Sequence, residues 1–282
     1  MCANDMRSQE MPAALSNSVG MDLIMVKPGS YMRGSRKSPT EVAEQYGGIR
    51  DLLELEHPRH EVHITRPFYI GKFPLTVGQF RSFIEDKPRM RIRLERGAWA
   101  WHEGAWSKRR DANWQNPYFP QDDTHPVVCL SWYDVWLFCE WLSRNENRRY
   151  GLPTEAQWEY ACRAGTLGEF CSGDSLELLD DYAWHWKNSE ARTHSVGLKK
   201  PNAWGIHDMH GHVLEWCRDW AGPYAGGPLA DPSGPEKGSY KICRGGSWLV
   251  YPHNLRSADR CRLLPSVRHA DLGLRVVMEW PA

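Results

Sequence analysis

The stretch Arg244-Gly-Gly-Ser-Trp248 opens a C-terminal segment that runs irregularly to Arg268 and closes on Gly273-Leu-Arg-Val-Val277. The two ends of this segment have regular patterns: a Gly-Gly turn that leads into a tryptophan, and a short apolar strand of period two. Between these ends, apolar, aromatic and charged residues follow one another without the period of a strand or of a helix. Fixed ends around an unpatterned interior predict a surface that is displayed on a framework.

The composition sets limits on the class of protein. The chain has 282 residues, enough to bury a sizeable core, and its 35 basic and 35 acidic residues give a formal net charge of zero. Because no basic excess exists, we expect no nucleic-acid partner. No apolar run approaches the roughly 18 residues of a membrane-spanning helix. The 15 tryptophans, 24 glycines and 19 prolines predict a loop-rich fold that packs indoles in its interior.

Three stretches have the polar cap and the apolar stripe that are typical of helices. Strands are predicted where apolar and polar residues alternate, and no solenoid repeat is present. The charged residues 36–59 are predicted as a loop, and the arginine-rich residues 87–125, which show little period, as a long loop with short strands. The chain is therefore predicted to be one α+β domain over residues 21–282. The predicted helices are 77–84 after Thr76, 132–145 after Ser131, and a third that begins at Thr154 with Gln157 in a capping box.

The first 20 residues are small and polar, and we predict a flexible tether over residues 1–20. The chain begins Met-Cys-Ala-Asn-Asp, as a bacterial lipoprotein does when a start codon replaces its signal peptide. This pattern predicts lipidation at Cys2 and a place on the bacterial cell surface or outer membrane, with the membrane contacted only through the lipid. The alternative is a cytosolic protein with a cysteine at its second position.

The eight cysteines form no Cys-x-x-Cys pair, so the sequence gives no support for a zinc ribbon or a thioredoxin-like site. An even number of cysteines allows disulfides, but the spacing fixes no connectivity. The simpler expectation is that most of them are buried free thiols.

The C-terminal turn belongs to a longer series of motifs. The series consists of Pro126-Val-Val-Cys-Leu-Ser-Trp132, Arg149-Tyr-Gly-Leu-Pro-Thr-Glu-Ala-Gln-Trp-Glu-Tyr-Ala-Cys-Arg-Ala-Gly165, Asn202-Ala-Trp-Gly-Ile-His-Asp-Met209, His212-Val-Leu-Glu-Trp216, Arg244-Gly-Gly-Ser-Trp248, Arg256-Ser-Ala258 and Gly273-Leu-Arg-Val-Val277. This series, in this order over nearly the whole chain, closely resembles the formylglycine-generating-enzyme (sulfatase-modifying factor) domain. The resemblance implies an elaborated C-type-lectin-like fold of class α+β, with two or three helices, many short strands and long loops. It leaves function open, because one fold carries many functions.

The enzymatic members of this family use a pair of cysteines shortly after the Gly-Gly-Ser-Trp turn as a copper-bound redox pair. The corresponding positions here are Val250 and Leu255, and neither side chain can act as a thiolate. Cys243 and Cys261 do not replace these cysteines by spacing. We therefore expect no catalytic residues and no enzymatic activity, with a formylglycine-type oxidase kept as the alternative.

The family's calcium motif, Asn-Val-x-Glu-Trp, appears here with His212 in place of the asparagine, while Glu215 remains. One oxygen ligand would be missing, so no metal or other cofactor is assigned and calcium stays an open question. A calcium-dependent lectin is a further alternative that rests on the fold alone, since the Glu-Pro-Asn type of sugar motif is absent.

A narrower resemblance is to the variable proteins of diversity-generating retroelements, in which this domain varies at its C-terminal end. That resemblance implies that adenines of asparagine codons, AAC or AAT, are replaced while the third base stays a pyrimidine. Codons for Met, Trp, Gln, Lys and Glu therefore cannot arise. None of these five residue types occurs in residues 249–271. They make up about a fifth of the chain, so about five would be expected in such a window. We therefore predict a variable region over about residues 244–277.

The predicted role is a non-enzymatic, surface-displayed receptor, a monomer that binds varied ligands, chiefly proteins, through a patch held as antibody loops are held. Tyr251, His253 and Arg262 are its natural anchors. The alternative for Leu249, Val250, Leu263 and Leu264 is burial in the core. The predicted ligand-binding positions are Leu249, Val250, Tyr251, His253, Asn254, Asp259, Arg262, Leu263, Leu264, Val267, His269, Ala270 and Asp271.

Other candidate residues are interpreted as structural. The spacing of His207, His210 and His212 fits no metal motif, so satisfied histidines are expected. Glu155 and Glu159 lie one helical turn apart, but the family resemblance makes them part of the scaffold rather than an acid–base pair.

Overall fold

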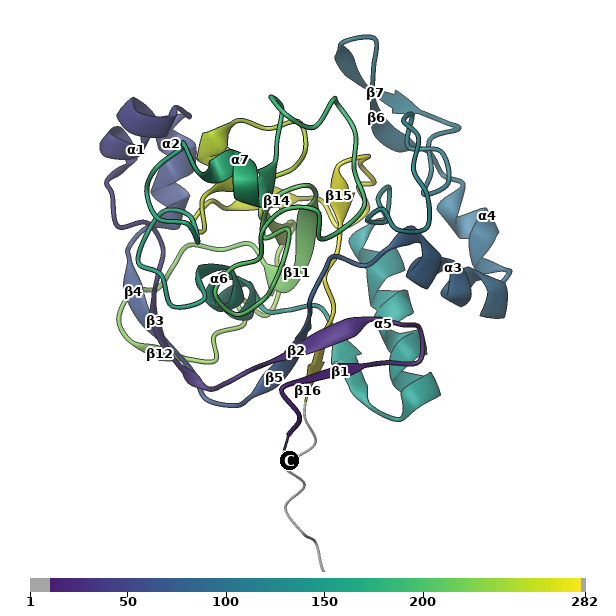
Figure 1. Ribbon diagram of the computed structural model, residues 1–282, viewed down its shortest axis with the longest axis horizontal. Helices are drawn as coiled ribbons and strands as arrows, with labels where there is room; N and C mark the ends of the chain where they lie inside the picture. The colour runs from purple at the N-terminus through teal and green to yellow at the C-terminus, as the bar shows by residue number, and fades with distance from the viewer. Residues whose placement is uncertain (1–10, 280–282) are drawn as a thin grey trace, which may run out of the picture.

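The computed structural model describes residues 11–279, and its architecture is α+β, as expected (Figure 1). A five-stranded sheet joins the two ends of this range, because its strands have the order β1-β2-β5-β16-β8. The last strand, β16, pairs antiparallel with both β5 and β8. The strands are β1 (Ala14–Ser16), β2 (Asp22–Val26), β5 (Phe68–Gly71), β8 (Arg149–Gly151) and β16 (Val277–Glu279).

A four-stranded sheet of order β14-β13-β11-β15 carries the C-terminal segment. A three-stranded sheet, β12-β4-β3, lies on the other side of helix α6 in the view of Figure 1. The remaining strands form the hairpin β6–β7 and the short pair β9–β10. The bounds are β11 (Leu214–Trp220), β13 (Lys241–Arg244), β14 (Cys261–Leu263), β15 (Leu272–Gly273), β3 (Gly29–Arg33), β4 (His60–Ile64), β12 (Leu229–Ala230), β6 (Ala98–His102), β7 (Ala105–Arg109), β9 (Ala183–Trp184) and β10 (His210–Gly211).

The three predicted helices are confirmed as α3 (Val77–Asp86), α5 (Trp132–Glu146) and α6 (Glu155–Arg163). Each begins with a capping box in which a Ser or Thr hydroxyl accepts the backbone N–H three residues on, and the side chain at that position accepts in return. These reciprocal bonds satisfy N–H groups that would otherwise lack a partner at the helix start. The apolar stripes of α3 and α5 face one shared core cluster.

The expectation of two or three helices is too low, and both predicted loop regions contain helices. The predicted loop 36–59 holds α1 (Pro39–Tyr46), α2 (Arg50–Leu53) and the 3-10 helix η1 (Glu54–Glu56). The arginine run is also helical rather than loop or strand, as α4 (Met90–Leu94). Two further short elements are α7 (Leu179–Tyr182) and the 3-10 helix η2 (Pro252–Leu255). All of these except α1 are too short for a full apolar period, and α1, with eight residues, starts with a capping box at Ser38 that the prediction missed.

Two boundaries also differ from the prediction. Residues 11–20 are not a tether, because β1 pairs with β2 and the Tyr69 hydroxyl donates to the carbonyl of Pro12 at 2.7 Å. Cys2 and the remainder of the predicted tether lie outside the described residues. The strand predicted at the C-terminal end is interrupted between β15 and β16, where the Arg275 side chain turns into the interior.

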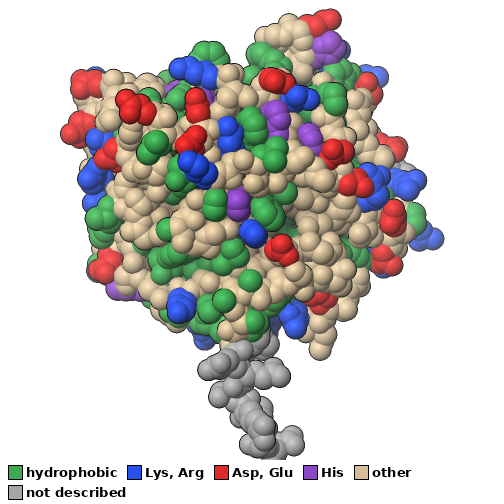
Figure 2. Space-filling model, in the orientation of Figure 1, with side chains coloured by type: hydrophobic (Ala, Val, Ile, Leu, Met, Phe, Trp, Pro, Cys, Tyr) green, Lys and Arg blue, Asp and Glu red, His purple; other side chains and the backbone are tan. Residues whose placement is uncertain are grey.

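The interior contains the predicted indoles, and Trp158, Trp216 and Trp248 are fully buried. The face in Figure 2 mixes hydrophobic side chains with charges of both signs, which agrees with the balanced composition. Among the described residues, no helix has the length and apolarity needed to cross a membrane.

Candidate ligand-binding surface

The Gly-Gly turn after β13 fixes the start of the C-terminal segment. Gly245 and Gly246 have φ angles of +99° and +71°, in the left-handed region that favours glycine. A Cβ atom at Gly246 would lie 2.6 Å from the carbonyl oxygen of Asn254, so the returning chain leaves no room for a side chain. Trp248 then enters the core, and its indole N–H donates to the carbonyl of Ala270 at 3.3 Å. The predicted turn and tryptophan are therefore confirmed as framework.

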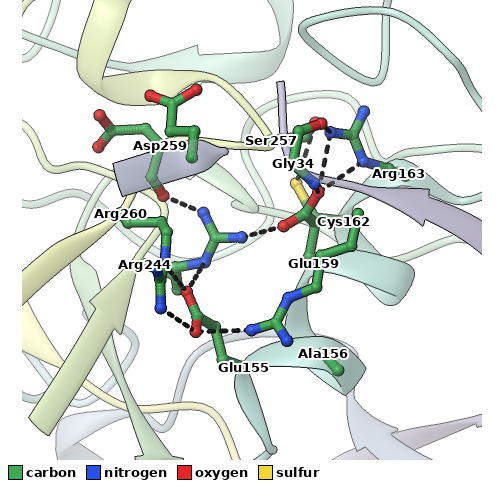
Figure 3. A network of polar contacts seen from close by, with 12 residues as sticks. Gly34, Glu155, Ala156, Glu159, Cys162, Arg163, Arg244, Ser257, Asp259 and Arg260 are labelled. Atoms are coloured by element: carbon green, nitrogen blue, oxygen red, sulfur yellow. Dashed lines mark hydrogen bonds and ion pairs between the residues drawn. The ribbon is translucent and has the colours of Figure 1, made fainter. Parts of the chain in front are cut away.

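Arg244, the residue before the turn, is fully buried in a network of ion pairs (Figure 3). Its guanidinium donates to Glu159 and to the backbone carbonyl of Asp259, and its Nε lies 3.3 Å from a carboxylate oxygen of Glu155. Arg163 holds the other Glu159 oxygen at 2.9 Å. The prediction that Glu155 and Glu159 are scaffold residues agrees with this geometry, because both carboxylates are occupied by arginines.

Glu155 is the centre of this network. Arg260 donates to its two oxygens at 2.6 and 2.8 Å, and Arg33 donates at 2.6 Å. Burial alone would raise the pKa of Glu155, but Arg260, Arg33 and Arg244 outweigh it and lower that pKa to about 2. Glu155 is therefore charged at neutral pH and links Arg244 and Arg260 of the segment, and Arg33 of β3, to helix α6.

Three more arginines of the C-terminal segment are anchored in the same way. Arg256 is fully buried and donates to Glu56 and Glu169, the latter at 3.2 Å. The other two anchors are the pair of Arg268 with Asp134 at 2.7 Å and that of Arg275 with Glu215 at 2.8 Å. These buried arginines anchor the segment to the interior at intervals, and they are called the pins below. Only the residues between the pins can reach the surface.

Between Trp248 and Arg256, the chain reaches the surface at Tyr251. The Tyr251 side chain is 55% exposed, and its ring centroid lies 5.0 Å from that of Trp186, which is itself 42% exposed. The ring of His253 lies parallel to that of Tyr251 at 6.2 Å. Burial lowers the pKa of His253 and the charge of Arg256 adds to the effect, so this imidazole is neutral at neutral pH. Two of the three predicted anchors therefore share one aromatic surface.

A second part of this surface adjoins the hairpin β6–β7. The ring of His269 lies 3.9 Å from that of Trp106, which also contacts Trp248. Leu249 packs partly buried against the same cluster. His269 and Leu249, which lie at opposite ends of the predicted patch, thus adjoin the same interior cluster.

Arg262, Leu263 and Leu264 have different neighbours. The first two lie on the edge strand β14, and the guanidinium of Arg262 lies 5.8 Å from the ring centroid of Tyr240. Leu264 is 47% exposed, whereas Leu263 packs partly buried against the main core cluster. The predicted patch is therefore divided among an aromatic group around Tyr251, the part around His269 beside the hairpin β6–β7, and an edge-strand group around Arg262.

The prediction of solvent-facing side chains is wrong for Ala270 and Asp271, which are buried. Asp271 accepts a hydrogen bond from the Ser247 hydroxyl at 2.7 Å and contacts the His269 ring, so it supports the turn. Val250 packs partly buried against an interior cluster, as Leu249 and Leu263 do, so the core alternative holds in part for these three. The other half-buried positions are Asn254, Asp259 and Val267.

Sequence reasoning missed the aromatic residues that border the patch from distant segments. Trp186 and Trp99 are 42% and 40% exposed, and the backbone of Trp99 pairs with that of His269. The only signal in the sequence was the large number of tryptophans, which does not indicate which indoles reach the surface.

Val250 and Leu255, the positions at which the sequence resemblance implies a cysteine pair, both lie next to Gly246. A Cβ atom on Gly246 would lie 2.6 Å from the Leu255 side chain and 3.1 Å from that of Val250. Both belong to one apolar cluster. Two hydrocarbon side chains occupy these positions, and they offer a metal no ligand.

The residues of the calcium motif are engaged in protein contacts. Glu215 accepts from Arg275 and from the indole N–H of Trp158, the latter at 2.7 Å. The His212 ring lies 3.0 Å from the carbonyl of His194. His207 and His210 likewise contact backbone carbonyls, as expected for satisfied histidines, although His207 is only half-buried. The prediction holds only in part for His212, whose buried Nδ1 makes no hydrogen bond and lies 3.4 Å from Asp208. Within residues 11–279, no group of three His, Cys, Asp or Glu side chains is placed to hold a metal ion.

The chain is similar to known proteins both in sequence and in structure. A model of the sulfatase-modifying factor enzyme 1-like domain matches residues 8–280. The formylglycine-generating enzyme of Streptomyces coelicolor is 31% identical over 261 residues, which cover 78% of this chain and 80% of that protein. The structure of PvdO from Pseudomonas aeruginosa has a TM-score of 0.80 at 26% identity, over 96% of this chain and all of the other.

The structure of Treponema denticola variable protein 1 has a TM-score of 0.73 at 22% identity, again over 96% of this chain and all of the other. This likeness shows a shared fold. The match over residues 8–280 and the identity with the Streptomyces enzyme show more: the chain belongs to the sulfatase-modifying factor enzyme 1-like domain family.

Proposed function

We propose that the protein is a non-enzymatic receptor whose C-terminal segment is diversified by a retroelement to bind varied ligands. The observation that carries this proposal is the division of residues 249–271 into buried pins and exposed side chains. Arg256, Ser257 and Ala258 are buried in the middle of the segment, whereas Tyr251 before them and Arg262 after them are exposed. The exposed positions can change without loss of the pins.

The exposed side chains are of the types that bind proteins well. Tyrosine and arginine are enriched among residues that dominate binding energies, and a tyrosine loses little conformational entropy when it is fixed. Tyr251 also has Trp186 beside it, so a partner would meet a ready-made aromatic pair. Because the pins already order the backbone, the entropic cost of binding is low.

The expected ligands are proteins and the expected state is a monomer. Exposed Tyr251 and Trp186 provide apolar area in one group, and exposed Leu264 and Arg262 combine apolar area with a charge in the other, a mixture that suits protein surfaces. A lipid on Cys2 would place the domain on the bacterial cell surface, where such ligands are met. No nucleic-acid partner is proposed, because the net charge is zero.

The main alternative is formylglycine-type oxidation, the activity that names the Streptomyces relative. Val250 and Leu255 argue against it, because their side chains can neither bind copper nor form a thiolate. Oxidation of a cysteine-containing peptide by the purified, copper-treated protein would overturn the non-enzymatic proposal. A calcium-dependent lectin is less supported, since Glu215 is already bound by Arg275; chelator-sensitive glycan binding would revive it.

The sharpest test of diversification is the DNA that flanks the gene. We expect a nearby reverse-transcriptase gene and a near-copy of the codons for residues 249–271, which differs from the gene only where the copy has adenine. The structure predicts where the differences fall: at exposed positions such as Tyr251, Arg262 and Leu264, and not at the buried Arg256. Absence of such a copy, or differences concentrated at the buried pins, would contradict the proposal.

A further inference from the structure

We propose that Cys243 and Cys261 are a dithiol pair that closes to a disulfide under oxidising conditions and fastens the edge strand β14 to β13. The two residues are direct partners in the antiparallel register of these strands. Partners in antiparallel strands have Cα atoms about 4.5–5.5 Å apart, inside the range of about 4.4–6.8 Å that disulfides require. Both side chains pack in the main core cluster, so they lie on the same face of the sheet.

The two thiols differ in access. Cys243 is fully buried, whereas Cys261 is half-buried and lines a hollow of about 220 Å³. Arg262, which is exposed, lines the same hollow, and its charge would attract an anionic reagent, whereas the charge of Arg260 is paired with Glu155. A small disulfide can therefore reach Cys261 before Cys243. Both thiols are free in this structure, as are the other described cysteines.

The chemistry is thiol–disulfide exchange with a small-molecule disulfide, such as oxidised glutathione, as the oxidant. The Cys261 thiolate attacks one sulfur of that disulfide, forms a mixed disulfide and releases one thiolate. The Cys243 thiolate then attacks the Cys261 sulfur, forms the protein disulfide and releases the second thiolate. The two cysteine protons end on the two released thiols, and the two electrons reduce the reagent.

The second step should be slow at neutral pH. Burial raises the pKa of the Cys243 thiol well above its usual value, and the neighbouring Cys261 thiol raises it further. Since only the thiolate attacks, ring closure should accelerate as the pH rises from neutral towards alkaline values.

The disulfide would act on a part of the segment that needs support. In its sheet, β14 pairs only with β13, because it is the edge strand. It carries Arg262 and Leu263, two of the predicted ligand-binding positions. A bond between Cys243 and Cys261 would close the loop that contains Tyr251 and hold both groups of the surface in register.

The test uses the full chain in its reduced form, incubated with oxidised glutathione, quenched in acid, alkylated and mapped by mass spectrometry without reduction. We expect a cross-linked peptide pair that contains Cys243 and Cys261, two fewer titratable thiols, and faster closure at higher pH. Amide exchange in β14 should slow once the bond has formed. A glutathione adduct that stays on Cys261 while Cys243 remains free would overturn the proposal, and so would no reaction at Cys261.

Matched variants separate the two steps. Cys261→Ser should take up no glutathione at this site, and Cys243→Ser should stop at the mixed disulfide on Cys261. Cys139→Ser removes another buried thiol and should leave the cross-link unchanged. If Cys243→Ser does not fold, the peptide map of the unmodified chain still decides the question.

Discussion

Arg256 and Arg262 lie close together in the same segment, but they occupy opposite environments. Arg256 has no exposed surface and is bound by two carboxylates, whereas Arg262 extends from an edge strand next to Tyr240. The first residue fixes the path of the backbone and the second is available to a partner. This difference teaches that the segment is a displayed surface only between its buried pins, and that residue type alone does not tell the two apart.

The buried pins determine structure more than they add stability. Removing an arginine and a glutamate from water has a large desolvation cost, which their attraction only partly offsets. Breaking such a pair is costly, however, because it leaves one charge buried alone. The pins therefore penalise any backbone path that pulls Arg244 or Arg256 away from its carboxylate.

The largest expected effect comes from removing a pin. We expect Arg256→Ala to lower the free energy of unfolding by about 3–5 kcal/mol, because Glu56 and Glu169 would be left buried without their cation. The matched variant Arg262→Ala should change the free energy of unfolding by no more than about 0.5 kcal/mol, as substitutions at exposed positions usually do. Denaturant unfolding of both variants measures the difference. Equal losses would mean that the two regions do not differ as described.

The next effect is the pH dependence that Glu155 contributes. Its pKa is about 2 in the folded chain, below the ordinary value of 4.5, so its stabilisation is present above pH 4.5 and is lost as the pH falls towards 2. This lowering of the pKa contributes roughly 3 kcal/mol at most to the free energy of unfolding. Unfolding measured from pH 6 to pH 2 should show this loss, and Glu155→Gln should flatten it. A Glu155→Gln variant with an unchanged acid profile would exclude Glu155 as the source.

The smallest of the three effects concerns the turn. Gly246 and Gly104 both have positive φ angles, but a Cβ atom would meet nearby atoms only at Gly246. We expect Gly104→Ala to cost about 1 kcal/mol from backbone strain alone. Gly246→Ala should cost roughly two to three times as much, because the carbonyl of Asn254 must also move. Thermal unfolding of the two variants provides the comparison, and equal costs would show that the turn is not tightly packed.

Helix starts and tight turns could be predicted from the sequence, because they depend on residues close together in the chain. The capping boxes at Thr76, Ser131 and Thr154 located the three main helices, and the two glycines located the turn. The α+β class followed from the predicted helices and strands, and the series of motifs implied the C-type-lectin-like fold. Helix α2 was missed because its four residues cannot show an apolar period. Helix α1 has eight residues but buries only Val42 and Tyr46, and its capping box at Ser38 was not recognised.

The site could be predicted only in part, because burial within the segment depends on distant residues. Ala270 looks like a surface position by sequence, but its N–H donates to the carbonyl of Trp99 at 2.8 Å, and the hairpin β6–β7 covers it. The neighbour of Tyr251 is Trp186, from a loop that has no apolar pattern of its own. Such contacts between segments far apart in the chain leave no local period for sequence reasoning to detect.

The most direct test of the division between pins and displayed residues is a pair of randomised libraries. One library varies the exposed or half-buried Tyr251, His253, Arg262 and Leu264, and the other varies the buried Arg244, Arg256, Ala270 and Asp271. The fraction of protease-resistant, folded members is measured in each. We predict that most members of the first library fold and that very few members of the second do. Similar fractions in the two libraries would contradict a displayed surface on a fixed framework.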